Sequence, residues 1–231
     1  KCAKFLFSSH SRYNEFPPIS EDELEAALAT LYSQRLLTAV GFGTGALIYL
    51  MENLKAEDGV IEYLTDIMNG PKRFVYSTHD IVDTIGMVSP FTPAEEQKQA
   101  VISALKNPVS ILTGGPGTGK TQTVSTIINT IKTLSSTAVI AMCAPTGKAA
   151  VRMSELTGSK KSSTIHRLLG IGNPQKELGV GELICDFLVV DEFSMVDIQL
   201  CERLFRCVCT HARVIIVGDD NQLPSVGPGL V

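Results

Sequence analysis

The hydrophobic positions near the start of the chain follow first a helical and then a strand pattern. Ser20 and Glu23 have the spacing of a capping box, and an apolar stripe at helical spacing follows, which predicts a helix ending near Gln34. Short apolar runs at 36–40 and 46–50 flank a glycine-rich turn and predict a β-hairpin. Residues 52–68 again show helical spacing. This order predicts a small α+β domain similar to part of a winged-helix module.

The glycine-rich turn admits a second interpretation. Gly41, Gly43 and Ala46 also fit a loose dinucleotide-binding fingerprint. That fingerprint needs a helix directly after the last small residue, whereas Ala46 leads into a strand-like run, so the pattern favours the hairpin. Winged-helix modules bind duplex DNA or protein, and the fold alone therefore assigns no function.

Residues 70–93 contain several helix breakers and read as a connector. We therefore expect a domain boundary near residue 90, with a small domain and linker at 1–90 and a larger domain at 91–231. A helix opening with Pro93, capped by Thr92, is predicted to run to Lys106, where Asn107 and Pro108 stop it.

The larger domain alternates short apolar runs with helical patterns. Apolar runs at 109–112, 138–143, 187–191 and 214–217 predict buried strands, and helices are predicted at 121–134, 145–156, 164–169 and 196–209. Such alternation predicts an α/β fold with a parallel sheet covered by helices on both faces. Ligands of such sheets bind at the carboxyl ends of the strands.

The first of these strands leads into a complete GxxxxGK[ST] loop at residues 114–121. Glycines let successive backbone N–H groups approach phosphate oxygens, and the following helix offers its positive N-terminal end to the same anion. Lys120 would reach the β- and γ-phosphates, and the Thr121 hydroxyl would hold Mg²⁺. A glycine-rich turn made only for tight packing is the alternative, and Lys120 and Thr121 together favour phosphate binding.

Two later strands also end in candidate chemistry. Asp191 and Glu192 follow an apolar strand in a Walker B pattern, in which Asp191 would orient the Mg²⁺ shell and Glu192 would activate water. The alternative is an acidic strand end on a solvated rim, which the upstream phosphate loop disfavours. Gln222 follows the next strand and could sense a γ-phosphate, although its spacing alone favours an ordinary polar turn.

Composition describes a globular protein. The chain has 231 residues, of which 44% are hydrophobic, and its mean hydropathy is +0.18. No apolar run reaches the roughly 18 residues of a membrane helix and no signal-peptide pattern is present, so we expect no membrane association and a cytoplasmic protein. Because it starts at Lys1 and ends at Val231, we expect a piece of a longer polypeptide.

The net charge of −4 argues against nonspecific coating of a polyanion, so nucleic-acid binding has to rest on particular residues.

The cysteines give no clear metal motif. Only two of the six are close in sequence, without a CxxC pair, which favours reduced core cysteines over a zinc site. They are Cys2, Cys143, Cys185, Cys201, Cys207 and Cys209.

Five segments together resemble the RecD-like DNA helicases of superfamily 1. They occur in the family's order and are 114–121, 144–150 (APTGKAA), 164–170 (TIHRLLG), 189–197 (VVDEFSMVD) and 218–229 (GDDNQLPSVGPG). The residues around Gln97 resemble the family's Q motif, so that the resemblance covers about 92–231, and 24–66 looks like the small domain that precedes the motor. The resemblance implies a P-loop NTPase (RecA-like) fold in 91–231, preceded by the winged-helix-like domain. It also implies an ATP-dependent motor that translocates 5′ to 3′ on single-stranded DNA.

The resemblance also implies ligands and site residues. The cofactors would be ATP and Mg²⁺, and the partners would be single-stranded DNA, junctions of single- and double-stranded DNA, and subunits of a recombination or repair complex. The catalytic residues would be Lys120, Glu192 and Gln222, and the metal would be held by Thr121 and Asp191. The nucleotide-binding residues, with Gln97 on the adenine edge, would be Gln97, Gly115, Pro116, Gly117, Thr118, Gly119, Lys120, Thr121 and Gln122. DNA would be contacted by Thr146, Gly147, Lys148, Thr164 and His166.

The DNA-binding residues have an ordinary alternative. Lys148 and Arg152 are four residues apart on one predicted helical face, which supports a basic track modestly. Without the resemblance, a solvated basic face and a buried core His166 would be the preferred interpretations.

Two features depart from the resemblance. Residues 171–185 stand where relatives carry a duplex-splitting hairpin, and this insertion is short here. The family's later motifs, including the arginines that stabilise charge during hydrolysis, belong to a second motor domain beyond Val231. We therefore expect residues 1–231 to bind ATP but to turn it over poorly.

Overall fold

The computed structural model describes residues 20–41, 45–115, 117–158, 162–219, 222 and 225–229. The chain forms two compact units, Lys1–Leu54 and Lys55–Val231, which are described separately. The boundary between the two units lies at residues 54 and 55, before the domain boundary that we expect near residue 90. Val60 and Ile67 belong to the second unit because their side chains pack into its core.

The first unit contains the predicted helix and hairpin. Helix α2 (Glu21–Ser33) begins with the expected capping box, in which the Ser20 hydroxyl accepts the Glu23 backbone N–H at 3.2 Å and the Glu23 carboxylate accepts the Ser20 N–H at 2.8 Å. Strands β1 (Leu37–Val40) and β2 (Leu47–Leu50) pair antiparallel. Helix α3 (Met51–Asn69) follows, so the order helix, hairpin, helix is confirmed. Gly43 of the alternative fingerprint lies outside the described residues.

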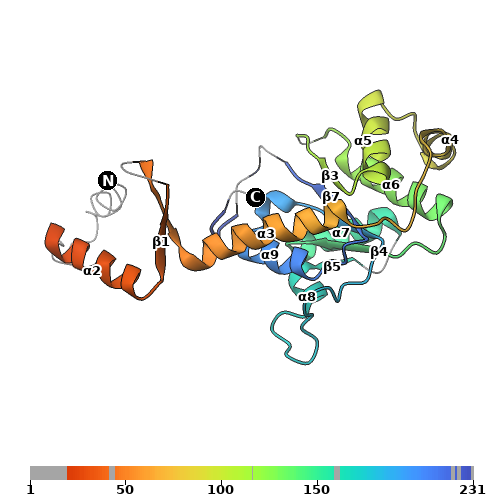
Figure 1. The fold of residues 1–231 in the computed structure, drawn as a ribbon. Coiled ribbons are helices and arrows are strands. Elements are labelled where there is room, and N and C mark those ends of the chain that lie inside the picture. The colour runs from red at the N-terminus through yellow and green to blue at the C-terminus, as the bar shows by residue number, and fades with distance from the viewer. Residues whose placement is uncertain are drawn as a thin grey trace. The chain divides into compact units, whose positions relative to one another are not determined.

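The second unit is built on a five-stranded, fully parallel sheet in the order β3-β7-β6-β4-β5 (Figure 1). Its strands are β3 (Val109–Leu112), β4 (Ile140–Ala144), β5 (Ser162–Thr164), β6 (Phe187–Val190) and β7 (Arg213–Val217). Its helices, besides most of α3, are α4 (Thr78–Val88), α5 (Glu95–Lys106), α6 (Lys120–Leu134), α7 (Gly147–Thr157), α8 (Ile165–Leu169), the 3-10 turn η2 (Phe193–Met195) and α9 (Ile198–Arg206).

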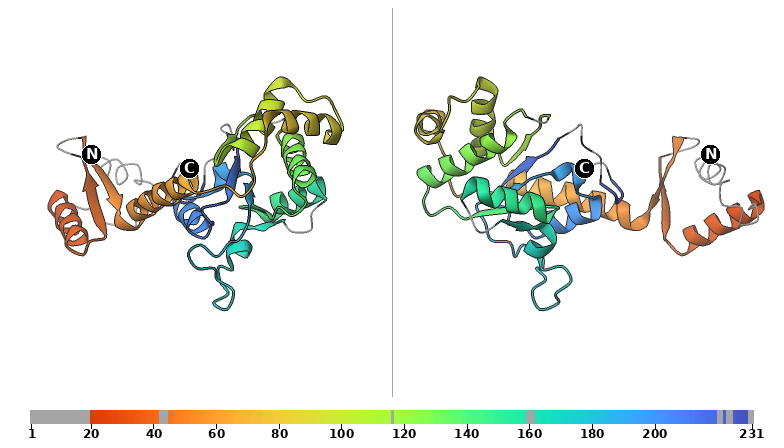
Figure 2. Two further views of the ribbon diagram at one scale, coloured as in Figure 1. Left: turned by 45° about the vertical axis from the view of Figure 1, so that its right-hand side comes forward. Right: turned by 180° about the vertical axis from the view of Figure 1, so that it is seen from behind.

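Side chains that alternate along the central strands form a core on each face of the sheet. Leu188 and Val190 of β6 pack in a cluster with residues of α3, α8 and α9. Phe187 and Val189 point to the opposite face, in a cluster with residues of α4, α5 and α6. Helices therefore cover both faces (Figure 2), and the predicted α/β P-loop NTPase fold is confirmed. Within the described residues, no helix has the length and apolar character to cross a membrane.

Four expectations about local structure need correction. The segment expected as a connector contains helix α4, whose first turn is capped by Ser77 and whose Ile81 and Ile85 are buried. Helix α5 begins at Glu95, and Ala94 rather than Thr92 is its N-cap residue. The Gln97 side chain accepts the Ala94 N–H at 3.1 Å.

The other two corrections lie later in the chain. The helix expected at 196–209 is shorter and runs as α9 from Ile198 to Arg206, because Asp197 is extended and caps its first turn. The short strand β5 precedes α8 and adds a fifth strand to the four predicted.

Candidate nucleotide site and neighbouring threonine caps

The carboxyl ends of three neighbouring strands surround one cavity of about 770 Å³. The phosphate loop follows β3, Asp191 and Glu192 follow β6, and Asp219 follows β7. The volume lies in the range of small-molecule sites. The cavity is lined by Gly115, Gly117, Thr118, Gly119, Lys120, Thr121, Gln122, Arg152, Glu155, Asp191, Glu192, Gly218, Asp219 and Gln222.

The phosphate loop has the backbone that its glycines permit. Gly117 and Gly119 have φ values of +79° and +83°, which side chains other than glycine rarely adopt. An added Cβ at Gly117 would meet no atom within 4 Å, whereas one at Gly119 would lie 2.6 Å from Gln97 Nε2. Gly119 also precedes the first residue of α6, so the positive end of a 15-residue helix opens into the cavity. Pro116 lies outside the described residues.

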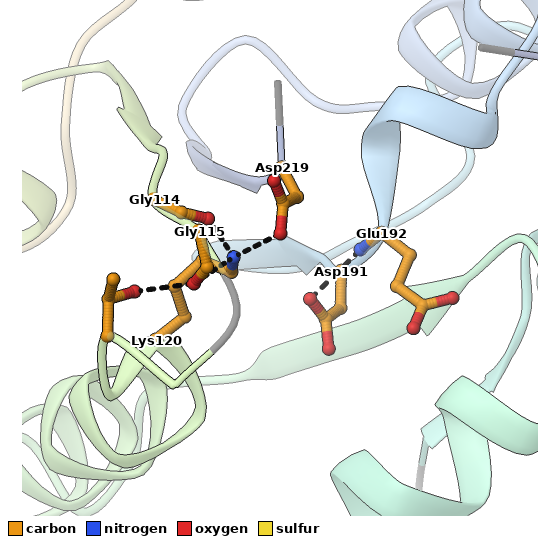
Figure 3. Close-up of polar contacts among 7 residues, drawn as sticks. Gly114, Gly115, Lys120, Asp191, Glu192 and Asp219 are labelled. Carbon is orange, nitrogen blue, oxygen red and sulfur yellow. Dashed lines mark hydrogen bonds and ion pairs between the residues drawn. The ribbon is translucent and has the colours of Figure 1, made fainter. Parts of the chain in front are cut away.

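The ammonium group of Lys120 is fully engaged inside the loop. It donates to the carbonyl oxygens of Gly114 and Gly115 and to Asp219 Oδ2, the last at 2.9 Å (Figure 3). An ammonium group has three donors, so all three are used. The Asp219 side chain is only 3% exposed, which makes this a buried ion pair.

Asp191 and Glu192 project from the strand end beside the loop. Burial raises the pKa of Asp191, while the Glu192 N–H, donated to Asp191 Oδ1 at 2.9 Å, and the charges of Arg152 and Lys120 lower it. Glu192 has φ of +52°, a left-handed conformation that costs a non-glycine residue about 1–3 kcal/mol. This turn sends the Glu192 side chain away from Lys120, with Asp191 between the two (Figure 3).

The two predicted glutamines are placed differently. Gln97 does not line the cavity but ties α5 to the phosphate loop, because its Nε2 donates to the Thr118 carbonyl at 3.3 Å. Gln222 lines the cavity, and its backbone N–H donates to the Asp219 carbonyl at 3.2 Å. A movement of the Asp219 backbone would therefore also move Gln222.

The donor set fits a magnesium nucleotide. The Thr121 hydroxyl and the Asp191 carboxylate line the same cavity, and both are oxygen ligands of the kind that Mg²⁺ prefers. The cradle of the phosphate loop lies beside them, where backbone amides and the start of α6 suit an anion. Among the described residues, no group of three or more His, Cys, Asp or Glu side chains could hold a metal by itself.

Four residues that line the cavity are not among the predicted site residues, namely Arg152, Glu155, Gly218 and Asp219. Arg152 and Glu155 line the cavity from α7, whereas Lys148 on the same helix does not. In the part of the chain that the structure describes, Arg152 forms no hydrogen bond or ion pair. The signal for Arg152 in the sequence is its four-residue spacing from Lys148, which predicts that the two residues share a helical face.

The residues proposed to contact DNA gather at a separate part of the same sheet edge. Ala144 of β4 pairs with Thr164 of β5, and Thr146 follows two residues later. Both threonines cap helices: the Thr146 hydroxyl accepts the Ala149 N–H and the Thr164 hydroxyl accepts the Arg167 N–H, each at 3.2 Å.

These capping bonds use the hydroxyls as acceptors and leave the O–H donors available. Gly147, Lys148 and His166 are exposed beside them, so the alternative of a buried His166 is wrong. The structure thus brings the five residues to one exposed region, and their role remains a prediction.

The short insertion at 171–185 is tied back to the sheet domain. The Leu178 N–H donates to the Leu169 carbonyl at 2.9 Å, and Leu183 forms an isolated bridge with Val208. Val180 and Ile184 are exposed at 68% and 74%. A role in separating strands remains a prediction.

The described cysteines are free thiols with buried side chains, apart from the half-buried Cys209. Burial raises the pKa of Cys201 to about 12, which keeps this thiol protonated. The expectation of core cysteines is confirmed for Cys143, Cys185, Cys201 and Cys207, and Cys2 lies outside the described residues.

Comparison with known proteins identifies the family. The family model described as AAA domain matches residues 97–228, which is more than half of the chain. The chain belongs to the AAA domain family. RecBCD enzyme subunit RecD of Haemophilus influenzae is 31% identical over 84% of this chain and 34% of that protein. The ATP-dependent RecD2 DNA helicase of Deinococcus radiodurans is 42% identical over 59% of this chain and 19% of that protein.

These relatives confirm the RecD-like resemblance, and the chain spans about a third or less of their length. A solved Pif1 helicase from Candida albicans is 22% identical, with a TM-score of 0.40 over 59% of this chain and 34% of that one. That structural likeness is too low to add to the fold assignment.

Proposed function

We propose that this chain is the nucleotide-binding part of an ATP-dependent DNA helicase that moves 5′ to 3′ on single-stranded DNA. The observation that supports this most is the convergence of Lys120, Asp191, Glu192 and Gln222 on one cavity, from the phosphate loop after β3 and from the ends of β6 and β7. The paired carboxylates favour hydrolysis over transfer to another substrate. The names of the RecD and RecD2 relatives support the substrate class.

The predicted site residues have distinct proposed roles. When bound, ATP with Mg²⁺ would supply the phosphoanhydride bond whose hydrolysis drives movement. Lys120 would bind the phosphates, and Thr121 and Asp191 would hold the metal. Glu192 would accept a proton from the attacking water, and Gln222 would position itself against the terminal phosphate. Gln97, fixed between α5 and the phosphate loop, would orient the base.

We propose that single-stranded DNA and the adjoining duplex junction lie across the threonine caps of α7 and α8. Two helix N-termini and the exposed side chains of Lys148 and His166 favour phosphate contacts there. DNA and nucleotide would then occupy the same edge of one sheet, at β4 and β5 and at β3, β7 and β6 respectively. Partner subunits of a recombination or repair complex, as the name RecBCD suggests for the relatives, are part of the same proposal.

Binding and activity test separate parts of this proposal. Residues 1–231 are expected to bind Mg²⁺ with the non-hydrolysable analogue AMP-PNP and to hydrolyse ATP slowly, because the charge-stabilising arginines are expected in a second motor domain. Lys120→Ala is expected to weaken that binding about tenfold or more, the contribution of hydrogen bonds to a charged group. Equal binding by both forms would refute the assigned phosphate site.

The full-length protein tests the motor. We expect strand displacement on duplexes with a 5′ single-stranded tail and none on duplexes with a 3′ tail. DNA-stimulated nucleotide binding without displacement would instead support a nucleotide-gated DNA-binding module.

A further inference from the structure

We propose that Asp219 is a positioning residue that holds Lys120 in the nucleotide-free protein and releases it to the phosphates, so that nucleotide binding is an exchange of partners. The inference rests on the proposed nucleotide site and adds a competitor within it. Lys120 and Asp219 are 99 residues apart in sequence and meet at 2.9 Å between Nζ and Oδ2.

The first step of the argument concerns Lys120. Its ammonium group donates to Asp219 and to two carbonyls of the phosphate loop itself, Gly114 and Gly115. Because an ammonium group has three donors, phosphate oxygens can be bound only if at least one of these bonds breaks. The bond to Asp219 is the one that carries an opposing charge, and a dianionic phosphate competes with it directly.

The second step concerns Asp219. Its side chain is 3% exposed, and a buried carboxylate that loses the opposite charge of its ion-pair partner is disfavoured. We therefore infer that release of Lys120 is accompanied by a movement of Asp219 or by a new contact to it. Either change costs free energy, which lowers the affinity for nucleotide.

The third step connects the exchange to Gln222. The Asp219 carbonyl accepts the Gln222 backbone N–H, so both residues belong to one turn after β7. A change at Asp219 is thereby transmitted to the residue that we place against the terminal phosphate. Breaking the ion pair between Lys120 and Asp219 would thus couple nucleotide binding at the phosphate loop to the conformation of this turn.

The test is Asp219→Asn in residues 1–231, titrated with AMP-PNP and Mg²⁺. Asparagine keeps the size of the side chain but removes its charge, and we expect about tenfold tighter binding, since charged hydrogen bonds are roughly twice as strong as neutral ones. Acetylation of Lys120 without nucleotide, followed by mass spectrometry, should be faster in Asp219→Asn, because the amine is no longer held in an ion pair with the carboxylate. A purely structural role would lower stability without either gain.

Asp186→Asn provides a matched control. Asp186 is also 3% exposed and ion-paired, to Arg73 at 3.5 Å, but it precedes β6 at the opposite end of the sheet. This variant should lose stability while its nucleotide affinity and Lys120 acetylation stay unchanged.

The outcomes separate the two proposals. If the wild-type chain binds AMP-PNP and Asp219→Asn binds equally or more weakly, the exchange is refuted while the nucleotide site stands. If neither form binds, the nucleotide site itself is refuted, and this inference falls with it. Equal acetylation of Lys120 in both forms would refute the ion pair independently of any nucleotide.

Discussion

Two threonines one turn apart on helix α6 offer a quantitative test of the structure around the phosphate loop. Thr126 and Thr130 are 2% and 0% exposed. The Thr126 hydroxyl donates to the Gln122 carbonyl at 3.0 Å, whereas, within the described residues, the Thr130 hydroxyl has no hydrogen-bond partner. Replacing each by valine exchanges the hydroxyl for a methyl group of similar shape.

The two substitutions should have opposite effects on stability. A buried hydroxyl without a partner costs about 1–3 kcal/mol, so Thr130→Val should raise the free energy of unfolding by about 1 kcal/mol. Thr126→Val should lower it by about 0.5–1 kcal/mol, because it removes a hydrogen bond while the Gln122 carbonyl keeps its helical partner. Both variants carry the same change in helix propensity, so that contribution cancels in their difference, which we expect to be about 1.5–2 kcal/mol.

Urea unfolding followed by far-UV circular dichroism measures this difference. Tryptophan fluorescence cannot be used because the chain contains no tryptophan. Unchanged m-values would show that the variants differ in stability and not in the extent of unfolding. If Thr130→Val proves no more stable than Thr126→Val, the assigned packing of α6 against the sheet is wrong.

Three further predictions concern chemistry and charge. Glu192→Gln in the full-length protein should keep ATP binding but slow hydrolysis about 10² to 10⁴-fold, the usual contribution of a general base, and a near-normal rate would remove Glu192 from that role. Arg152→Ala should weaken AMP-PNP binding about two- to fivefold, as expected for an exposed charge, without affecting the binding of single-stranded DNA. Lys148→Ala should instead weaken the binding of single-stranded DNA and reduce its salt slope by about 0.7, without affecting AMP-PNP binding. Identical effects of the two variants would contradict the separation of the two surfaces. Burial and the charge of Arg213 lower the pKa of Lys72 to about 8. Between about pH 8 and pH 10.5 the unfolded chain therefore holds more protons than the folded chain, so the free energy of unfolding should rise with pH in that window. Lys72→Met should lack this rise, which pH-dependent urea unfolding measures.

Local signals in the sequence were sufficient for much of the fold. The capping box at Ser20 and Glu23 and the short apolar strands carry their information within a few residues, and the structure confirms them. Helix α4 was missed because breakers flank it on both sides. Its own signals, Ser77 as a cap and the four-residue spacing of Ile81 and Ile85, are short.

The contiguous motifs of the site could be predicted from the sequence, whereas a contact between residues that are far apart in the chain could not. The residues of the phosphate loop and the Asp191 and Glu192 pair were predicted, because each motif is contiguous and follows a strand. The partner of Lys120 could not be predicted, because only the pairing of β3 with β7 brings Asp219 to it.

The position of Arg152 beside the cavity could not be predicted for a related reason. Residues four apart on a helix differ by about 40° in direction, and the packing of α7 decides which of them faces the cavity. Met153 and Ala150 are buried at that contact, which turns Arg152 toward the cavity and leaves Lys148 exposed elsewhere.

The parallel register of β3 and β7 makes the site sensitive to insertions and deletions. Leu112 pairs with Val217, and Gly114 and Asp219 each lie two residues beyond this pair. Since side chains alternate between the two faces of a sheet, one residue added to or removed from β7 would send Asp219 to the wrong face while a five-stranded sheet could still form. Loss of a single codon in β7 would thus remove the contact between Asp219 and Lys120 from a protein that still folds, a defect that measurements of expression or secondary structure would not detect.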